Sequence, residues 1–157
     1  METFFKDYIE RLQALHFDVI RELEGSALEA LNWVPGPGMN SLSVLVVHLT
    51  GAERYWLGDV AMGEPSGRDR AAEFLVKDIE FNTLKARLDD SIQYIQAALE
   101  RLALQDLERV CVSPRDGHEF TVAWVLLYIQ AHTALHLGHI QITRQLWEAD
   151  HTSIDGG

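Results

Sequence analysis

The histidines are the side chains of this sequence whose spacing points most directly to chemistry. Three of them, His132, His136 and His139, follow one another at steps of four and three residues within an apolar segment. On a helix, His136 would lie about 40° to one side of His132 and His139 about 20° to the other. The Cβ atoms of His132 and His136 would be roughly 5–6 Å apart, so that both rings can reach one ion at about 2.1 Å. The spacing therefore predicts a metal site.

These histidines interrupt the apolar seam that we trace along the same helix. Steps of three and four residues lead through Val122, Val125, Ile129, His132, His136, His139, Thr143 and Leu146. Burying three imidazoles without partners would cost on the order of 1–3 kcal/mol each. One shared metal ion would supply a partner to all of these imidazoles, which is a simpler arrangement than a separate hydrogen-bond partner for each.

His48 is the best candidate for a third ligand. It is the only histidine in a second apolar segment, where Leu45, Val47 and Leu49 surround it. If the two segments are neighbours, His48 completes a three-histidine site that leaves coordination positions open for water or substrate. Taken alone, a core histidine is more often a hydrogen-bonded packing residue, and that reading stays open.

Two tyrosines are weaker candidates for catalytic groups. Tyr128 precedes His132 by one helical turn, and Tyr55 follows His48 by two turns, so either phenol could reach a shared pocket. Packing against the core is the simpler role for both. Glu53 would lie about 140° around the helix from His48, which makes it a poor candidate for direct contact.

Four segments with apolar residues at helical spacing must position these groups. We expect helices over residues 3–31, 42–61, 78–103 and 122–147. The turn over residues 35–38 separates the first two helices. Asn40 or Ser41 can cap the second helix, and Thr121 can cap the fourth. No strand pattern competes. The sequence therefore predicts an all-α four-helix bundle, with the order and direction of the helices left open by the long middle linkers.

Length and charge bound the function classes. The 157 residues predict one domain over residues 1–150, followed by a flexible tail over 151–157. A net charge of −11 disfavours nucleic acid and anionic membrane surfaces as partners. The single cysteine, Cys111, cannot form an internal disulfide, and the N-terminus lacks the pattern of a secretion signal. We therefore expect a cytoplasmic protein.

Two stretches of this sequence together resemble a known family. Residues 41–57, SLSVLVVHLTGAERYWL, follow the Pro/Gly turn, and residues 132–140, HTALHLGHI, follow some eighty residues later. Both are similar to the DinB/YfiT-like superfamily of bacterial metal-binding four-helix proteins, and the likeness covers nearly the whole chain. The resemblance implies that His48, His132 and His136 bind a divalent metal. It also implies an up-down-down-up bundle with a long crossing connection, and a homodimer.

The resemblance further implies a chemistry, because characterised relatives include thiol-dependent enzymes such as mycothiol-dependent maleylpyruvate isomerase and bacillithiol transferases. A low-molecular-weight thiol would then attack a small-molecule electrophilic substrate. The family commonly continues with His-Arg-Gly-Gln where this chain reads His136-Leu137-Gly138-His139. His139 is therefore a candidate fourth ligand, hydrogen-bond partner of a ligand, or substrate contact.

Three function hypotheses remain at this point. The first is a metal-dependent, thiol-dependent transferase or isomerase. The alternatives are a metal-dependent hydrolase with the same ligands, and a non-catalytic metal-binding or dimerisation module. Imidazole ligands suit several ions, so iron and manganese remain compatible, with zinc and nickel as the leading candidates.

Overall fold

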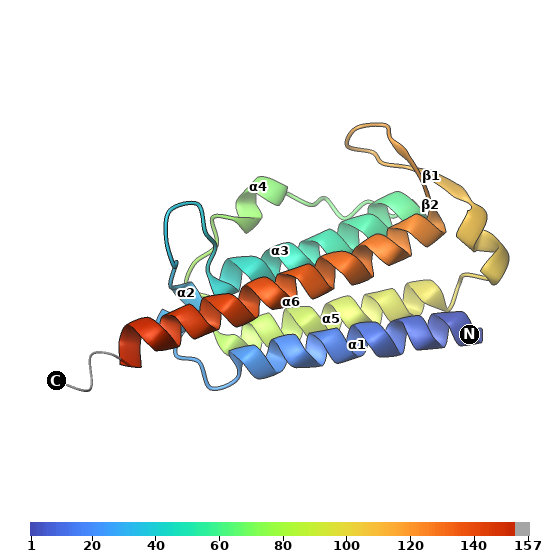
Figure 1. Ribbon diagram of the computed structural model, residues 1–157. Coiled ribbons are helices and arrows are strands. Elements are labelled where there is room, and N and C mark those ends of the chain that lie inside the picture. Colours follow the sequence, from blue (N-terminus) through green and yellow to red (C-terminus); the bar gives the residue numbers. More distant parts are fainter. Residues whose placement is uncertain (153–157) are drawn as a thin grey trace.

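The computed structural model describes residues 1–152 and contains a bundle of four long helices (Figure 1). They are α1 Thr3–Leu23, α3 Leu42–Arg54, α5 Phe81–Leu99 and α6 Val122–Thr152. A π-helix, η1 Tyr55–Met62, continues α3. Within the described part of the chain, no helix is both long and apolar enough to cross a membrane.

The helices run up, down, down and up, as the resemblance implies. α1 and α6 point one way, and α3 and α5 point the other way (Figure 1). Contacts at both ends of the α1 and α6 pair agree with the picture. The Tyr8 hydroxyl donates to the Leu126 carbonyl at 3.0 Å, and Arg144 donates to the Glu22 carbonyl at 2.7 Å.

Because α3 and α5 are parallel, the chain must travel back along the bundle between them. Residues 63–80 make this crossing connection and carry the short helix α4 Arg70–Glu73, which packs over α3 (Figure 1). From the sequence we expected only a long linker here. Its path along α3 brings polar side chains of the linker close to the middle of that helix.

Three further short elements occupy the ends of the bundle: α2 Leu28–Asn32, the 3-10 helix η2 Leu104–Glu108, and a hairpin of β1 Val110–Val112 and β2 Glu119–Thr121. The strands are antiparallel, with Cys111 opposite Phe120. We expected no strands from the sequence, and this was wrong for the linker between α5 and α6. Strands of three residues are too short for an alternating pattern to be recognised.

Several helix boundaries differ from the sequence-based expectation. The first helix ends at Leu23 rather than 31, because Gly25 takes a positive φ of 77° that stops it. The last helix continues to Thr152, so His151 is helical and not part of a tail, while residues 153–157 lie outside the described residues. Ser41 rather than Asn40 caps α3, because its side chain accepts from the Val44 N–H.

A charged side chain lies at the centre of the apolar core. Glu53, on α3, is only 1% exposed. Its Oε1 accepts hydrogen bonds from His16 Nε2 on α1 and Thr133 Oγ1 on α6, both at 2.8 Å. Its Oε2 accepts from Ser91 Oγ on α5 at 2.6 Å. One carboxylate therefore receives a hydrogen bond from each of the other three long helices.

The surroundings keep Glu53 ionised. Burial raises the pKa of this carboxyl, but the charge and hydrogen bond of His16, together with the two hydroxyl donors, outweigh burial, and the pKa falls below its ordinary value. The carboxylate is an acceptor only, which matches three converging donors.

We expect Glu53→Gln to destabilise the protein by about 3–5 kcal/mol, since it removes the buried negative charge and replaces one acceptor oxygen with an NH2 group that faces another donor. Urea unfolding measures the change. Glu10→Gln, at an exposed site on α1, is the control and should stay within about 0.5 kcal/mol of the wild type.

The difference between wild type and Glu53→Gln should also depend on pH. The folded-state pKa of Glu53 is below the ordinary 4.5. The ionised carboxylate therefore stabilises the fold fully at pH values above 4.5, and this stabilisation is lost as the pH falls from 4.5 through the folded-state pKa. A difference that stays constant from neutral to acidic pH would contradict the assignment.

Candidate metal centre

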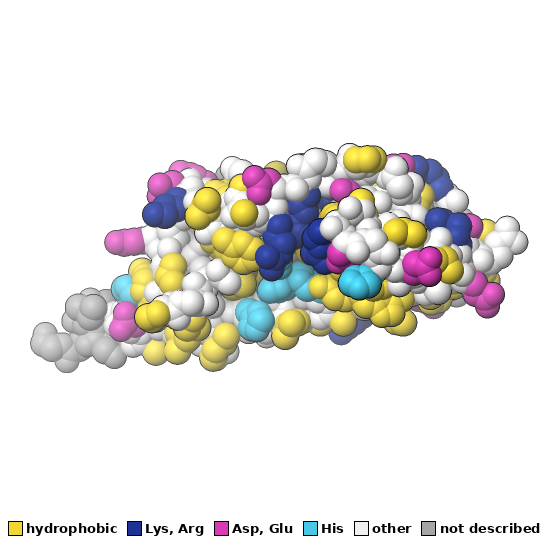
Figure 2. All heavy atoms as spheres, turned by 90° about the horizontal axis from the view of Figure 1, so that it is seen from above, with side chains coloured by type: hydrophobic (Ala, Val, Ile, Leu, Met, Phe, Trp, Pro, Cys, Tyr) yellow, Lys and Arg dark blue, Asp and Glu magenta, His cyan; other side chains and the backbone are white. Residues whose placement is uncertain are grey.

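The structure brings together the three histidines that the sequence analysis singled out. His48 lies on α3, and His132 and His136 lie on the neighbouring α6. One ring nitrogen from each lies within 4.8 Å of the other two. The ring centroid of His48 is 5.3 Å from that of His132 and 5.0 Å from that of His136. Histidine side chains are visible near the middle of the face in Figure 2.

The nitrogen spacing fits a metal ion. The Nε2 atoms of His132 and His136 are 3.1 Å apart. Two nitrogens that each lie about 2.1 Å from a tetrahedral ion are separated by roughly 3.4 Å. A single N–H···N hydrogen bond also accounts for this one distance. It does not account for a third imidazole, from another helix, at the same point.

The seam that we traced through the histidines was wrong by one residue. The buried track of α6 continues from Ile129 through Thr133, Leu137 and Ile140. His132 and His136 are half-buried beside this track, and His139 is exposed. Two tracks offset by one residue share the same three- and four-residue steps, and only packing decides which one faces the core. The histidines therefore border the core and keep one side toward solvent.

Glu73 and Arg68 support His48, and sequence reasoning missed both. The Oε2 atom of Glu73 is 2.9 Å from His48 Nδ1, and Arg68 Nη2 donates to the same carboxylate at 2.8 Å. With Nδ1–H donating to Glu73, the lone pair of His48 is on Nε2 and available to an ion. Both residues come from the crossing connection.

Gly51 makes room for the Glu73 carboxylate. A Cβ at this helical position would collide with the Glu73 side chain and would also crowd Arg68 Nε at 3.3 Å. A glycine in a helix interior normally costs stability, so its presence one turn after His48 has a packing reason. This glycine was the one signal in the sequence that a side chain from elsewhere docks beside His48.

The electrostatics favour neutral imidazoles next to an ionised carboxylate. Burial, followed by the charge of His48, lowers the pKa of His132 to about 4. Burial and the neighbouring histidines lower the pKa of His136 to about 3. Burial raises the pKa of Glu73, but the hydrogen bonds from Arg68 and His48 outweigh it and the net shift is downward. At neutral pH, His132 and His136 thus present lone pairs rather than positive charges.

The structure gives the three weaker candidates distinct positions. His139 Nδ1 lies 3.4 Å from His136 Nδ1, so His139 contacts the ring edge that points away from His132 and does not join the cluster. Tyr128 stacks on His132 with 5.4 Å between ring centroids. The Tyr55 hydroxyl hydrogen-bonds Ser113 Oγ at 2.9 Å, which ties the hairpin to η1.

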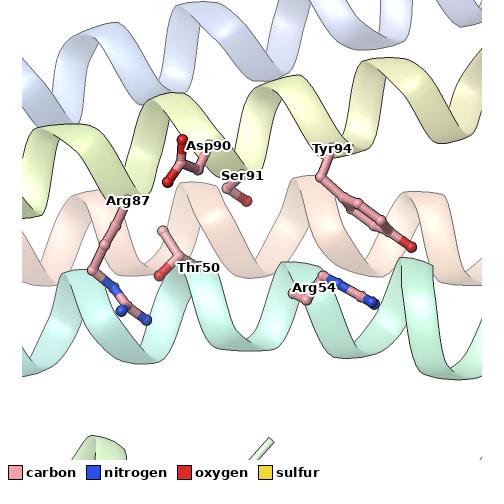
Figure 3. Close-up of a pocket in the computed structure, with 6 residues that line it drawn as sticks. All are labelled: Thr50, Arg54, Arg87, Asp90, Ser91 and Tyr94. Atoms are coloured by element: carbon pink, nitrogen blue, oxygen red, sulfur yellow. The ribbon is translucent and has the colours of Figure 1, made fainter. Parts of the chain in front are cut away.

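A separate hollow of about 320 Å³ lies between α3 and α5 (Figure 3). It is lined by Thr50, Arg54, Arg87, Asp90, Ser91 and Tyr94. Thr50 and Arg54 lie on the side of α3 opposite His48, because they are about 200° and 240° further around the helix. This hollow is therefore not part of the histidine site.

Comparisons with known proteins agree with this architecture. The family model of the DinB superfamily matches residues 8–140. A conserved protein from Enterococcus faecalis is similar in structure, with a TM-score of 0.77, 16% identity, and coverage of 93% of this chain and 97% of that chain. A comparison with curated proteins found no match.

YfiT from Bacillus subtilis is also similar in structure. Its TM-score is 0.74 at 18% identity, with coverage of 92% of this chain and 89% of that chain. It is described as a probable metal-dependent hydrolase with an unusual four-helix bundle topology. At such identities the two structures establish the shared fold alone. The family match extends over most of the chain, and on that basis the protein belongs to the DinB superfamily.

Proposed function

We propose that His48, His132 and His136 hold a divalent metal ion, and that the protein is a metal-dependent transferase or isomerase acting with a low-molecular-weight thiol on a small electrophilic substrate. One observation carries the metal part, namely three ligand nitrogens from two helices within 4.8 Å of one another. Zinc and nickel are the leading ions for an all-imidazole set.

The ion would supply activation of a nucleophile, because a divalent cation lowers the pKa of a bound thiol or water. The protein side chains provide orientation and shielding. Glu73 holds the His48 ring through Nδ1, and His139 contacts the Nδ1 edge of His136. Tyr128 stacks on His132 and packs on Trp56 at 4.7 Å between centroids, which shields one side of the cluster from water.

The carboxylates around the cluster favour a thiol over water as the nucleophile. Glu73 is engaged by Arg68 and His48, and Glu53 is enclosed in the core by three other donors. Neither is available as a general base for water. A free thiol has a pKa of about 8.5, against about 15.7 for water, so a thiol bound to the ion would release its proton to solvent with less need of a base. The sequence likeness to thiol-dependent relatives supports the same choice.

A metal-dependent hydrolase is the second candidate. The observation in its favour is the description of the similar YfiT structure as a probable metal-dependent hydrolase. Such an enzyme would use the same three histidines, and the two candidates differ only in the nucleophile.

We expect His136→Ala to lose stoichiometric metal while remaining helical, since the core forms without the ion. Elemental analysis of protein prepared without a histidine tag measures the metal, and circular dichroism measures the helix content. His118→Ala is the control, because its side chain is 76% exposed in the hairpin and should leave the metal content unchanged. Equal metal content in both variants would refute the site.

We expect Gly51→Ala to weaken zinc binding by about 10–100-fold, because the added methyl group displaces Glu73 from His48. Gly138→Ala is the matched control. It is also within a helix, has nothing within 4 Å of the added Cβ, and should stabilise the fold by up to about 1 kcal/mol with zinc affinity unchanged. Competition with a chelating dye gives the affinities. Equal zinc affinity in the two variants would show that Glu73 does not support the site.

The nucleophile can be identified with metal-loaded protein and two substrates. We expect formation of a thioether from cysteine and chlorodinitrobenzene to be faster than the uncatalysed reaction, and to be lost in His136→Ala. Hydrolysis of a nitrophenyl ester that is independent of added thiol would instead favour the hydrolase. If neither reaction depends on His136, the non-catalytic metal-binding module is favoured over both enzymes.

A further inference from the structure

A basic pocket adjoins the histidine cluster on the side of the crossing connection. Its volume is about 260 Å³. It is lined by Tyr55, Asp59, Arg68, Arg70, Pro114 and Arg115. These residues come from η1, from the chain around the start of α4, and from the hairpin turn. Figure 2 shows Lys and Arg side chains next to histidines near the middle of this face.

The arginines of this pocket are unequally paired. Arg68 forms two hydrogen bonds with Glu73, and Arg115 Nη2 lies 3.2 Å from the exposed Asp116. Among the described residues, Arg70 has no carboxylate within ion-pair distance, and its guanidinium carbon lies 5.1 Å from the centroid of the Phe74 ring. Arg70 therefore has its full hydrogen-bonding capacity available to a ligand.

The carboxylate inside the pocket, that of Asp59, already has an ion-pair partner. Asp59 has a side chain only 10% exposed, lies 3.4 Å from Arg54 Nη1, and accepts from the Ser66 N–H at 3.1 Å. The pocket and its ion-pair partners thus contain four guanidinium groups and three carboxylates. They are Arg54, Arg68, Arg70 and Arg115, with Asp59, Glu73 and Asp116. This gives a net positive charge in a chain whose net charge is −11.

Tyr55 holds the two sides of the pocket in place. The guanidinium carbons of Arg68 and Arg115 lie 5.7 and 5.8 Å from the centroid of its ring. Its hydroxyl bonds Ser113, two residues before Arg115, so the hairpin cannot move away without losing this contact. The ring thus adds an apolar side chain to a pocket that also contains cationic groups, which suits a short carbon chain that ends in an anion.

Arg68 connects this pocket to the histidines. Its Nη2 atom is 3.5 Å from His48 Nδ1, so a molecule in the pocket lies one side chain away from the cluster. We propose that the pocket binds a carboxylate of the substrate through Arg70 and Arg115, and so selects acidic electrophiles for the reaction at the histidines. This assignment of substrate class rests on the proposed function, whereas anion binding itself does not require a metal.

Binding of succinate tests the proposal, with its uncharged diamide, succinamide, as the matched ligand. The metal-free full chain is titrated and followed by NMR of the backbone and arginine Nε–H groups, so that carboxylate coordination to an ion cannot contribute. We expect saturable shifts at Arg70 and Arg115 with succinate and none with succinamide. Arg70→Gln and Arg115→Gln should each weaken succinate binding by about tenfold.

Arg87→Gln is the control variant, because Arg87 is an exposed arginine of α5 that lines the separate hollow in Figure 3. Its succinate affinity should equal that of the wild type. Equal binding of succinate and succinamide, or unchanged affinity in both pocket variants, would overturn the proposal. A chain that binds succinate as expected but no zinc would refute the proposed metal function and leave the anion pocket standing. A chain that binds zinc but not succinate would refute the anion pocket and leave the metal function standing.

Discussion

The Glu53 carboxylate is the interaction on which the arrangement of the bundle depends. A buried charge is tolerated only when donors surround it, and here His16, Ser91 and Thr133 each bring one donor from a different helix. This condition restricts how the helices can slide and rotate. Because Thr133 follows His132 directly, the hydrogen bond that satisfies Glu53 also turns the histidines of α6 toward the edge of the bundle that His48 shares.

The position at the edge explains the character of the histidine site. Full burial would close the ring nitrogens off, and full exposure would leave the pKa values of the rings at their ordinary level. At half-burial, His132 and His136 have strongly lowered pKa values and still face an open side. Such rings are neutral ligands at physiological pH, which a divalent cation requires.

The topology of the bundle supplies the rest of the site. Two consecutive parallel helices need a connection that runs back along the bundle, and this connection lies over α3 near His48. It contributes Glu73 to the ring of His48 and Arg68 to both the cluster and the basic pocket. The aromatic residues of α6 lie on another side of the histidines. One side of the site is thus apolar and another cationic, in a chain that is acidic as a whole.

The sequence by itself determined the features that depend on local geometry. The four long helices, a cap at Asn40 or Ser41 and the pairing of His132 with His136 follow from the residues of single segments, and the structure contains the helices, the cap at Ser41 and the histidine pair. The direction of the helices followed only from the family likeness, and the metal itself remains a proposal.

Tertiary structure alone decided which track of α6 is buried, because neighbouring tracks share the same periodicity and the helices packed against α6 make the choice. It also decided the contacts of Glu53 and Glu73. Glu73 meets His48 across 25 positions, and Glu53 meets Thr133 across 80. No local rule encodes such separations, since they depend on how whole helices and a crossing connection pack together.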